Sequence, residues 1–389
     1  MGVGVGHHGW ALHEEKGVVL CVFCGVWLVV RGTYGVIRHG AGRGPAAFFA
    51  FCQRRTAEMA SFGNTDVLLP RIGFGAMGIT SFYAGEGPSE SIEEQGIQAM
   101  VAYAQAVAPL KAHIDTALVY TALRPGGRHN EEVVGEAVRR IGRDNVFLAT
   151  KGSMTMAFEP DSSDAGLRSQ LASSLTRLGV SSVDLFYEHR RDPGTPIESV
   201  MATMKALAGE GKIKFAGLSE VTATELRRAC AVFPVTAVQM EYSLQARSIE
   251  SELLGVAKEL GVAVVAYSPL GRGMLASTFK CLDALPEGDW RRASPRWGEQ
   301  VNFAKAAALP DLAASCSITP AQLALAWVLS RGDHVFAIPG TKSPARALEN
   351  SAASALKLSA GILAKVEAAV PEAEGDRYAN KHGQFETRA

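Results

Sequence analysis

From Arg71 onward, short runs of apolar or β-branched residues alternate with longer stretches in which apolar positions repeat at helical spacing. This alternation is typical of βα units built around a parallel sheet. The strands we expect are Ile72–Met77, His113–Thr116, Val146–Thr150, Val183–Tyr187, Phe215–Ser219, Ala237–Glu241, Ala263–Tyr267 and Phe336–Ile338. The helices we expect are Ser89–Val107, Glu131–Ile141, Ala165–Leu178, Ile197–Ala208, Ala223–Cys230, Ser248–Leu260, Pro320–Leu329 and Pro344–Ala355.

Eight such units in about 280 residues match the usual size of a closed (β/α)8 barrel, the α/β fold also called a TIM barrel. An open doubly wound sheet is the alternative. The segment Gly73–Gly78 imitates the G-x-G-x-x-G signature of that fold, but it runs into a loop rather than a helix. The one long excursion, Gly271–Ser317, follows the seventh strand, where a large loop would cover an active site. We therefore expect a single barrel domain over residues 59–389.

Residues 1–58 differ from the rest because they are rich in glycine, poor in acidic residues and without clear helix or strand periodicity. The apolar run Gly17–Val30 has about 14 residues, which is too short to span a bilayer comfortably. We expect a non-core extension, and two origins stay open: an organellar transit peptide, or a mis-assigned start with Met59 as the first residue. The expected location is cytoplasmic, or a plastid or other organelle if the extension is a transit peptide.

The 39 basic and 39 acidic residues balance to a formal net charge of zero, and no basic stripe is present. Nucleic acid is therefore not an expected partner. Cys21 and Cys24 form a C-x-x-C motif, but no second cysteine or histidine pair completes a zinc site. We expect no metal and no membrane partner, and the 47% of apolar residues supports a well-buried core.

In a barrel, chemistry gathers at the carboxyl ends of the strands, and three successive strands end there in ionisable residues. The second strand ends near Asp115, with Tyr120 five residues further on, the third near Lys151 and the fourth near His189. Each residue alone has a structural explanation, such as a turn cap, a solvated lysine or a packed aromatic ring. Together they would converge on one mouth of the barrel.

These four side chains make chemical sense as an acid–base set. A phenol has a pKa of about 10 and is a slow acid at neutral pH, but a nearby ammonium favours the phenolate and lowers that pKa. A carboxylate beside the lysine holds the ammonium in place, and an imidazole can orient a carbonyl group. The set would deliver a proton to a developing alkoxide while hydride arrives at carbon, which is what carbonyl reduction requires.

Several segments resemble motifs of the aldo-keto reductase superfamily, and the resemblance extends roughly from Thr65 to Ala355. The segments, in order, are Asp115–Tyr120, His129–Gly135, Asp184–Arg190, Gly217–Glu220, Tyr267–Gly271 and Ile338–Ser343. Each motif alone is only modestly specific for the family, but several of them in the family's order are strong evidence of resemblance. The pyridoxal-reductase-like branch of plants and bacteria, with GLSE and SPLGRG sequences, is the most similar.

The resemblance implies a role for each matched residue. It makes Tyr120 the general acid, Lys151 and Asp115 the pair that tunes it, and His189 the residue that orients the carbonyl. It also implies NADPH as the cofactor. Near the nicotinamide it places Ser219, Gln239 and Tyr267, with the Tyr267 ring stacked on it. Along the pyrophosphate it places Ser268, Leu270 and Gly271; at the 2′-phosphate Thr341, Lys342 and Arg346; and near the adenine Glu349 and Asn350.

The sequence departs from the usual family pattern at Glu220 and Thr121, which leaves the shape of the substrate pocket open. The expected partner is a small-molecule carbonyl compound, with pyridoxal as one candidate. Trp290 and Trp297 are candidates for a pocket wall or for plain packing. Two other functions stay open: a non-catalytic NADPH-binding sensor or channel-associated subunit, and a Schiff-base lyase that uses Lys151. The loops expected to form the pocket are Phe82–Pro88, Leu123–Arg128 and Met274–Val301.

Overall fold

The computed structural model describes residues 58–83, 88–122, 125–279 and 281–378, together with three strands nearer the N-terminus. The chain divides into two compact units, Met1–Arg54 and Arg55–Ala389. In the first unit, the strands form one antiparallel sheet: β1 (Ala11–Glu15), β2 (Val18–Phe23) and β3 (Val26–Arg31). The apolar run Gly17–Val30, which shows no clear periodicity in the sequence, pairs with itself as β2 and β3. The C-x-x-C side chains lie outside the described residues.

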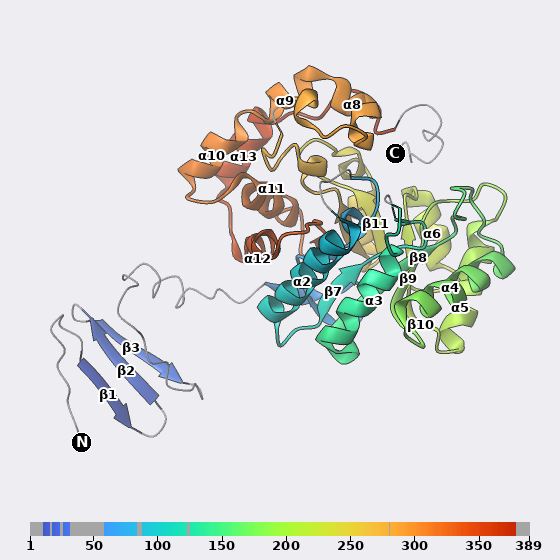
Figure 1. Cartoon of the computed structure of the whole chain (residues 1–389), viewed down its shortest axis with the longest axis horizontal. Coiled ribbons are helices and arrows are strands. Elements are labelled where there is room, and N and C mark those ends of the chain that lie inside the picture. The colour runs from blue at the N-terminus through green and yellow to red at the C-terminus, as the bar shows by residue number, and fades with distance from the viewer. Residues whose placement is uncertain are drawn as a thin grey trace. The chain divides into compact units, whose positions relative to one another are not determined.

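The second unit is built around eight parallel strands, which follow one another around the sheet in chain order. They are β6 (Phe74–Gly75), β7 (Ala112–Asp115), β8 (Val146–Gly152), β9 (Val183–Glu188), β10 (Ile213–Ser219), β11 (Val235–Glu241), β12 (Ala263–Tyr267) and β13 (Val335–Ala337). A parallel bridge between Ile72 and Ala337 joins the two outermost strands and closes the sheet. The predicted barrel is therefore confirmed, and Figure 1 shows its helices outside the strands.

The seam between β6 and β13 combines backbone and side-chain contacts. Gly73 N donates to the Ala337 carbonyl over 2.8 Å, and Ala337 N donates to the Arg71 carbonyl over 3.0 Å. The buried side chain of Arg71 crosses the seam, where its Nε donates to the Val335 carbonyl over 3.2 Å and its Nη2 to the Leu329 carbonyl over 2.6 Å. Arg71 thereby joins the start of the first strand to the last βα unit.

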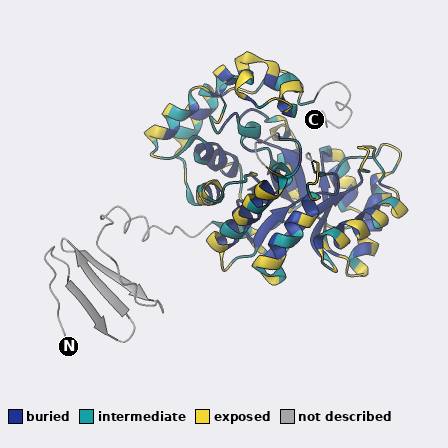
Figure 2. Ribbon diagram, in the orientation of Figure 1, coloured by how far each residue is buried: buried dark blue, intermediate teal, exposed yellow. Residues whose placement is uncertain are grey.

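The helices turn a buried face toward the barrel and an exposed face outward, as Figure 2 shows. They are α2 (Ser89–Val107), α3 (Asn130–Ile141), α4 (Asp164–Leu178), α5 (Ile197–Gly209), α6 (Ala223–Cys230), α7 (Leu253–Glu259), α11 (Pro320–Leu329) and α12 (Pro344–Ala352). Capping boxes at Thr222 and Thr319 begin α6 and α11, because each side-chain oxygen accepts an unpaired N–H of the first turn. Most of the predicted bounds of the helices and strands lie within two residues of the observed bounds. The predicted helices Ser248–Leu260 and Pro344–Ala355 each contain a 3-10 helix at one end.

A hairpin that the sequence did not predict fills the amino end of the barrel. Its strands β4 (Met59–Ser61) and β5 (Leu68–Pro70) are antiparallel. Phe62 and Leu69 from this hairpin are fully buried in the cluster inside the barrel. The ring of Phe62 meets that of Phe147 edge to face, with centroids 5.1 Å apart. Because this hairpin, which we call the plug, fills the amino end, only the carboxyl end of the barrel is open for an active site.

Two positions show how closely the plug packs. At Gly63, where φ is +62°, a Cβ atom would lie 2.1 Å from the Thr236 carbonyl oxygen, so only glycine fits there. The His113 ring lies 5.4 Å from the Phe62 ring and 5.5 Å from the Phe147 ring. Neither ring nitrogen of His113 has a hydrogen-bond partner among the described residues. Burial therefore lowers the pKa of His113 to about 4.

The excursion after β12 contains short helices rather than a plain loop. They include two 3-10 helices, Gly271–Gly273 and Trp290–Ala293, and the helices α8 (Pro295–Gly298), α9 (Gln300–Ala306) and α10 (Leu309–Ser315). A further unpredicted helix, α13 (Ala360–Ala369), packs beside α10, as Figure 1 shows. Among the described residues, no single helix is long and apolar enough to cross a membrane; Gln300–Ser315 and Pro320–Leu329 qualify only as a pair bent by 93°.

Candidate active site

The four predicted catalytic residues lie at the carboxyl end of the barrel. Asp115 ends β7, Tyr120 lies in the loop that follows, Lys151 lies near the end of β8, and His189 follows β9. All four are buried: Lys151 is 0% exposed, Asp115 2%, and Tyr120 and His189 8% each. The structure therefore brings these side chains to one place, out of bulk water.

Lys151 is fixed by charge and by hydrogen bonds. Its Nζ pairs with Asp115 Oδ1 and donates to the Thr116 carbonyl over 2.8 Å. The same Nζ lies 5.2 Å from the centroid of the Tyr120 ring. The other carboxylate oxygen, Asp115 Oδ2, accepts a hydrogen bond of 2.8 Å from Gln239 Nε2. Both oxygens of Asp115 are therefore engaged, and the lysine cation is held beside the phenol.

The phenol of Tyr120 does not have the lowered pKa that the sequence led us to expect. Burial raises the pKa of Tyr120 above its ordinary value, and the charge and hydrogen bond of Lys151 oppose this effect only in part. The lowering effect expected of the Lys151 ammonium is present, but the loss of solvent around the phenol outweighs it. A raised pKa keeps the proton on Tyr120 near neutral pH, so this phenol remains a proton donor.

His189 faces Tyr120, with ring centroids 5.7 Å apart and ring planes at 87°. Its Nδ1 is buried and has no hydrogen-bond partner in the described part of the chain. Burial, followed by the charges of Arg190 and Lys151, holds the pKa of His189 well below its usual range. The imidazole is therefore neutral near pH 7, so it can hold a polar substrate atom without being the source of a proton.

The loop that carries Tyr120 is anchored by Asn130, the first residue of α3. The Asn130 side chain donates to the Ala76 carbonyl over 3.0 Å and to Thr80 Oγ1 over 2.9 Å, and it accepts from Thr116 Oγ1 over 2.7 Å. Its backbone N–H donates to the Tyr120 carbonyl over 3.0 Å. Sequence reasoning missed this role, because the partners of one amide come from segments far apart in the chain.

The residues expected near the nicotinamide lie close to the ends of three neighbouring strands: Ser219 on β10, Gln239 on β11 and Tyr267 on β12. Gln239 already donates to Asp115, a contact that the sequence did not predict. Arg190 Nη1 donates to Ser219 Oγ over 3.3 Å, and its guanidinium lies 5.8 Å from the centroid of the Tyr267 ring. An arginine that sequence reasoning missed therefore lies among these residues.

The residues expected along the pyrophosphate form a tight turn after β12. Ser268 and Gly271 have positive φ angles, of 50° and 54°. Gly271 N donates to the Ser268 carbonyl over 2.9 Å, and Leu275 N donates to the Leu270 carbonyl over 3.1 Å. Left-handed backbone at a side-chain-bearing residue such as Ser268 is strained, and such strain is often found at ligand sites.

The residues expected at the adenosine end lie on or just before α12: Thr341, Lys342, Arg346, Glu349 and Asn350. Arg346 is exposed on the first turn of this helix. Glu349 instead accepts a hydrogen bond of 2.6 Å from Thr319 Oγ1, which joins α12 to the start of α11. Asn350 is buried. The structure thus brings the cations to the amino end of α12 and turns Glu349 toward a neighbouring helix.

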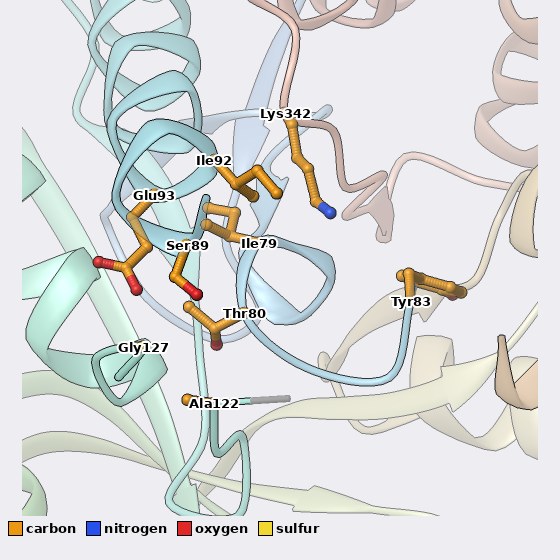
Figure 3. Close-up of a pocket in the computed structure, with 9 residues that line it drawn as sticks. All are labelled: Ile79, Thr80, Tyr83, Ser89, Ile92, Glu93, Ala122, Gly127 and Lys342. Carbon is orange, nitrogen blue, oxygen red and sulfur yellow. The ribbon is translucent and has the colours of Figure 1, made fainter. Parts of the chain in front are cut away.

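A small cavity lies beside Lys342, at the amino end of α2. Its volume is about 20 Å³, which is room for one water molecule. Its lining residues are Ile79, Thr80, Tyr83, Ser89, Ile92, Glu93, Ala122, Gly127 and Lys342. In Figure 3, Glu93 and Lys342 lie on opposite sides of Ile79 and Ile92. The cavity is too small for a dinucleotide or for a carbonyl substrate.

An aromatic wall borders Tyr120. The ring of Phe82 lies edge to face with those of Tyr120, Phe158 and Trp290, at centroid distances of 6.3, 6.2 and 6.2 Å. Trp290 therefore belongs to this wall, whereas Trp297 is 2% exposed and packs in the core against neighbouring rings. Three parts of the predicted pocket loops, residues 84–87, 123–124 and 280, lie outside the described residues.

Comparison with known sequences identifies relatives over most of the chain. The profile of the Aldo/keto reductase family matches residues 71–371. The chain is 39% identical over 336 residues to aldo-keto reductase yakc of Schizosaccharomyces pombe, whose name specifies NADP(+); the match covers 81% of this chain and 93% of the yeast protein. Probable aldo-keto reductase 1 of Glycine max is 38% identical over 337 residues, covering 84% of this chain and 94% of the plant protein.

Solved structures share the barrel. An aldo/keto reductase from Klebsiella pneumoniae in complex with NADP and acetate has a TM-score of 0.62 at 26% identity, covering 83% of this chain and 99% of its own. The glycerol dehydrogenase AKR11B4 from Gluconobacter oxydans has a TM-score of 0.68 at 24% identity, covering 80% of this chain and 95% of its own, and shows the fold alone. The predicted fold and oxidoreductase class are confirmed. The chain belongs to the aldo/keto reductase family.

Proposed function

We propose that this protein reduces an aldehyde or ketone to the alcohol, with NADPH as the hydride source and Tyr120 as the general acid. The observation that carries the proposal is the environment of Lys151, which pairs with Asp115 and lies 5.2 Å from the Tyr120 ring. Family membership supports carbonyl reduction at this place. The buried imidazole of His189, facing the phenol, supports a position for the carbonyl oxygen between them.

The described residues fit a phosphorylated dinucleotide. Lys342 and Arg346 bring two cations to the amino end of α12, where the backbone N–H groups of the first turn also favour a phosphate. A 2′-phosphate distinguishes NADPH from NADH, so this cluster favours NADPH. The yeast relative is named for NADP(+), and the Klebsiella pneumoniae structure contains NADP, which supports the same choice. When bound, the dinucleotide would supply a hydride to the carbonyl carbon.

In the proposed reaction, the residues of the chain supply the proton and hold the substrate. The neutral imidazole of His189 donates a hydrogen bond to the carbonyl oxygen and sets its orientation. Tyr120 gives its hydroxyl proton to the same oxygen as negative charge develops there. Lys151 stabilises the phenolate that is left, and Asp115, which accepts a hydrogen bond from Gln239, keeps the lysine cation in place.

For the substrate, we propose a small aldehyde, with pyridoxal as the first compound to test. The rings of Phe82, Phe158 and Trp290 next to Tyr120 support a flat and partly apolar substrate, because aromatic rings pack well against one another. The resemblance of the GLSE and SPLGRG segments to the pyridoxal-reductase-like branch is a second support. The rate of NADPH oxidation, measured with a panel of carbonyl compounds that includes pyridoxal, ranks the candidate substrates.

Tyr120→Phe tests the acid assignment. We expect the variant to lose carbonyl reduction by at least about 100-fold, because the proton donor is gone. It should bind NADPH as tightly as the wild type, because the ring remains. NADPH oxidation and fluorescence titration measure the two effects separately.

Tyr103→Phe is the matched control for this experiment. The Tyr103 hydroxyl donates to the Ile72 carbonyl over 2.9 Å, away from the four catalytic candidates. This control should keep wild-type turnover, so that the loss in Tyr120→Phe cannot be ascribed to removing any buried hydroxyl. Wild-type turnover by Tyr120→Phe would refute the assignment.

The alternative functions have distinct outcomes. Tight NADPH binding without turnover on any carbonyl compound would favour a non-catalytic sensor. A Schiff-base lyase needs a neutral and accessible amine. Lys151 is instead 0% exposed and bound by Asp115 and the Thr116 carbonyl, which opposes that role. Borohydride trapping of a carbonyl compound on Lys151 would favour the lyase over the reductase.

A further inference from the structure

After α13, the chain folds back across the carboxyl end of the barrel. Asn302 clamps Glu374 there: its Oδ1 accepts the Glu374 N–H over 2.8 Å, and its Nδ2 donates to the Glu374 carbonyl over 2.8 Å. Ser294 Oγ then donates to the Arg377 carbonyl over 3.1 Å. These contacts fix the C-terminal segment to the helical excursion and bring the side chain of Arg377 to the mouth of the barrel.

Arg377 joins the ends of three neighbouring strands. Its Nη1 donates to the Tyr267 hydroxyl over 2.8 Å and to Glu220 Oε1 over 3.0 Å. Its Nε pairs with Glu241 Oε2 over 2.9 Å. Tyr267 in turn donates its hydroxyl proton to Glu220 Oε1 over 2.9 Å. The Tyr267 hydroxyl is thus held from two sides, by a cation that donates to it and a carboxylate that accepts from it.

This cluster is shielded from water. The side chain of Arg377 is 10% exposed, that of Glu220 1% and that of Glu241 4%. Burial raises the pKa of Glu220, but Arg377 and Arg190 outweigh it and hold that pKa below its usual range. Burial also raises the pKa of Tyr267 well above its ordinary value, so its hydroxyl stays a donor. Glu241 also pairs with Arg296 Nη1 over 3.3 Å, so the buried charges of this cluster compensate one another, which favours this one arrangement.

We propose that Arg377 is a positioning residue for the cofactor: by fixing the Tyr267 hydroxyl, it sets the plane of the ring on which the nicotinamide would stack. The inference rests on the proposed function, since it takes Tyr267 as the stacking residue. Arg377 lies beyond the part of the chain that matches the family profile, which ends at residue 371. The contact of Arg377 with the Tyr267 hydroxyl is therefore contributed by the C-terminal segment and not by the region that matches the family profile.

The Tyr267 ring needs this support because a tyrosine side chain can rotate about its χ angles. Beside the ring lies the Arg190 guanidinium at 5.8 Å, a contact that does not fix the ring plane. Without the partners of its hydroxyl, the ring would adopt several orientations, and cofactor binding would have to order it. Ordering a side chain on binding reduces affinity.

Arg377→Lys and Tyr267→Phe, alone and together, test the proposal. Lysine keeps the positive charge, but it cannot contact Tyr267, Glu220 and Glu241 from one planar group. We expect each single variant to weaken NADPH binding by up to about tenfold, because the Tyr267 ring must then be ordered when the cofactor binds. The double variant should bind no more weakly than either single variant, because both changes remove the same contact. Fluorescence titration with NADPH measures Kd without depending on turnover.

Arg247→Lys is the matched control. Arg247 Nη2 donates to the Val370 carbonyl over 2.7 Å, so this change loosens the region before the C-terminal segment without touching Tyr267. Its Tm should fall while its Kd for NADPH stays at the wild-type value. Equal Kd values for Arg377→Lys and Arg247→Lys, or losses that simply add in the double variant, would overturn the proposal.

Two further results separate this proposal from the function it rests on. If Arg377→Lys does not fold, Tyr267→Phe decides alone, and an unchanged Kd for NADPH overturns the positioning role. If the wild type does not bind NADPH, or if Tyr120→Phe keeps full turnover, the proposed function itself is refuted. Wild-type binding and turnover combined with a normal Kd in Arg377→Lys would remove the positioning role and leave the reductase standing.

Discussion

At the scale of single residues, burial affects the pKa values of Tyr120 and His189 more than neighbouring charges do. Tyr120 keeps its proton beside Lys151, and burial makes His189 a neutral imidazole. Both residues could be nominated from the sequence because each follows a predicted strand. Their pKa values could not, since these depend on solvent excluded by residues elsewhere. The contact between Gln239 and Asp115 was hidden for a related reason, because its partners are 124 positions apart.

His113 allows the effect of burial to be measured as stability. Its pKa is about 4 in the folded protein, against about 6.5 in an unfolded chain. Above the unfolded value, both states are neutral at this residue and folding is unaffected by it. As the pH falls from about 6.5 toward about 4, the unfolded chain takes up the proton first, so the fold loses up to about 3 kcal/mol.

We expect His113→Leu to flatten this pH dependence. Urea denaturation at a series of pH values gives the free energy of unfolding for the variant and the wild type. The two curves should run parallel above pH 6.5, as judged from the unperturbed value, and converge or cross below it. A variant that loses stability on acidification as steeply as the wild type would show that His113 is not the group responsible.

At the scale of secondary-structure elements, short length explains part of what the sequence did not predict. The bounds of α2, with 19 residues, and of β12, with 5, agree with the sequence pattern. The hairpin strands β4 and β5 have 3 residues each and α8 has 4, which is too short for a period to show. These elements form because of contacts with the barrel and with the excursion, and the local pattern of apolar residues does not indicate such contacts.

The fit of the hairpin can be tested at its glycine. Gly63→Ala places a methyl group 2.1 Å from the Thr236 carbonyl oxygen at a positive φ. Gly211→Ala is the control, because its φ is +69° but nothing lies within 4 Å of the added atom. We expect Gly63→Ala to lower the free energy of unfolding by about 1–3 kcal/mol more than the control does. Equal losses in urea denaturation would mean that the hairpin can move aside.

The amino end of α12 carries the prediction for cofactor choice. Replacing both Lys342 and Arg346 by alanine removes the two cations expected at the 2′-phosphate. We expect the Kd for NADPH to rise at least about tenfold, because charge-assisted phosphate contacts are lost. The Kd for NADH should change little, since NADH has no such phosphate. Equal losses for the two nucleotides in fluorescence titrations would assign these residues to another part of the ligand, or to none.

At the scale of the whole molecule, counting βα units was sufficient to predict the barrel, because eight repeats of this kind have few ways to close. The excursion Gly271–Ser317 was expected to cover its mouth, but the part of the cover that the C-terminal segment supplies was beyond prediction. Arg377 contacts Glu220 and Tyr267 across separations of 157 and 110 positions, and its segment has no periodicity of its own. The candidate acid–base residues were thus accessible from strand ends, while the residues that orient them were accessible only from the folded chain.

The closed seam affects how this protein should respond to heat. Among the described strands of the eight-stranded sheet, each has a neighbour on both sides, so no row of unpaired backbone groups is offered to another molecule. The junction between β6 and β13 has one bridge, of Ile72 with Ala337, one further backbone hydrogen bond, from Gly75 N to the Pro339 carbonyl over 3.2 Å, and the contacts of Arg71, so we expect it to part first. Two strand edges with unpaired N–H and C=O groups would then be exposed together, and aggregation of the warmed protein would start at this seam.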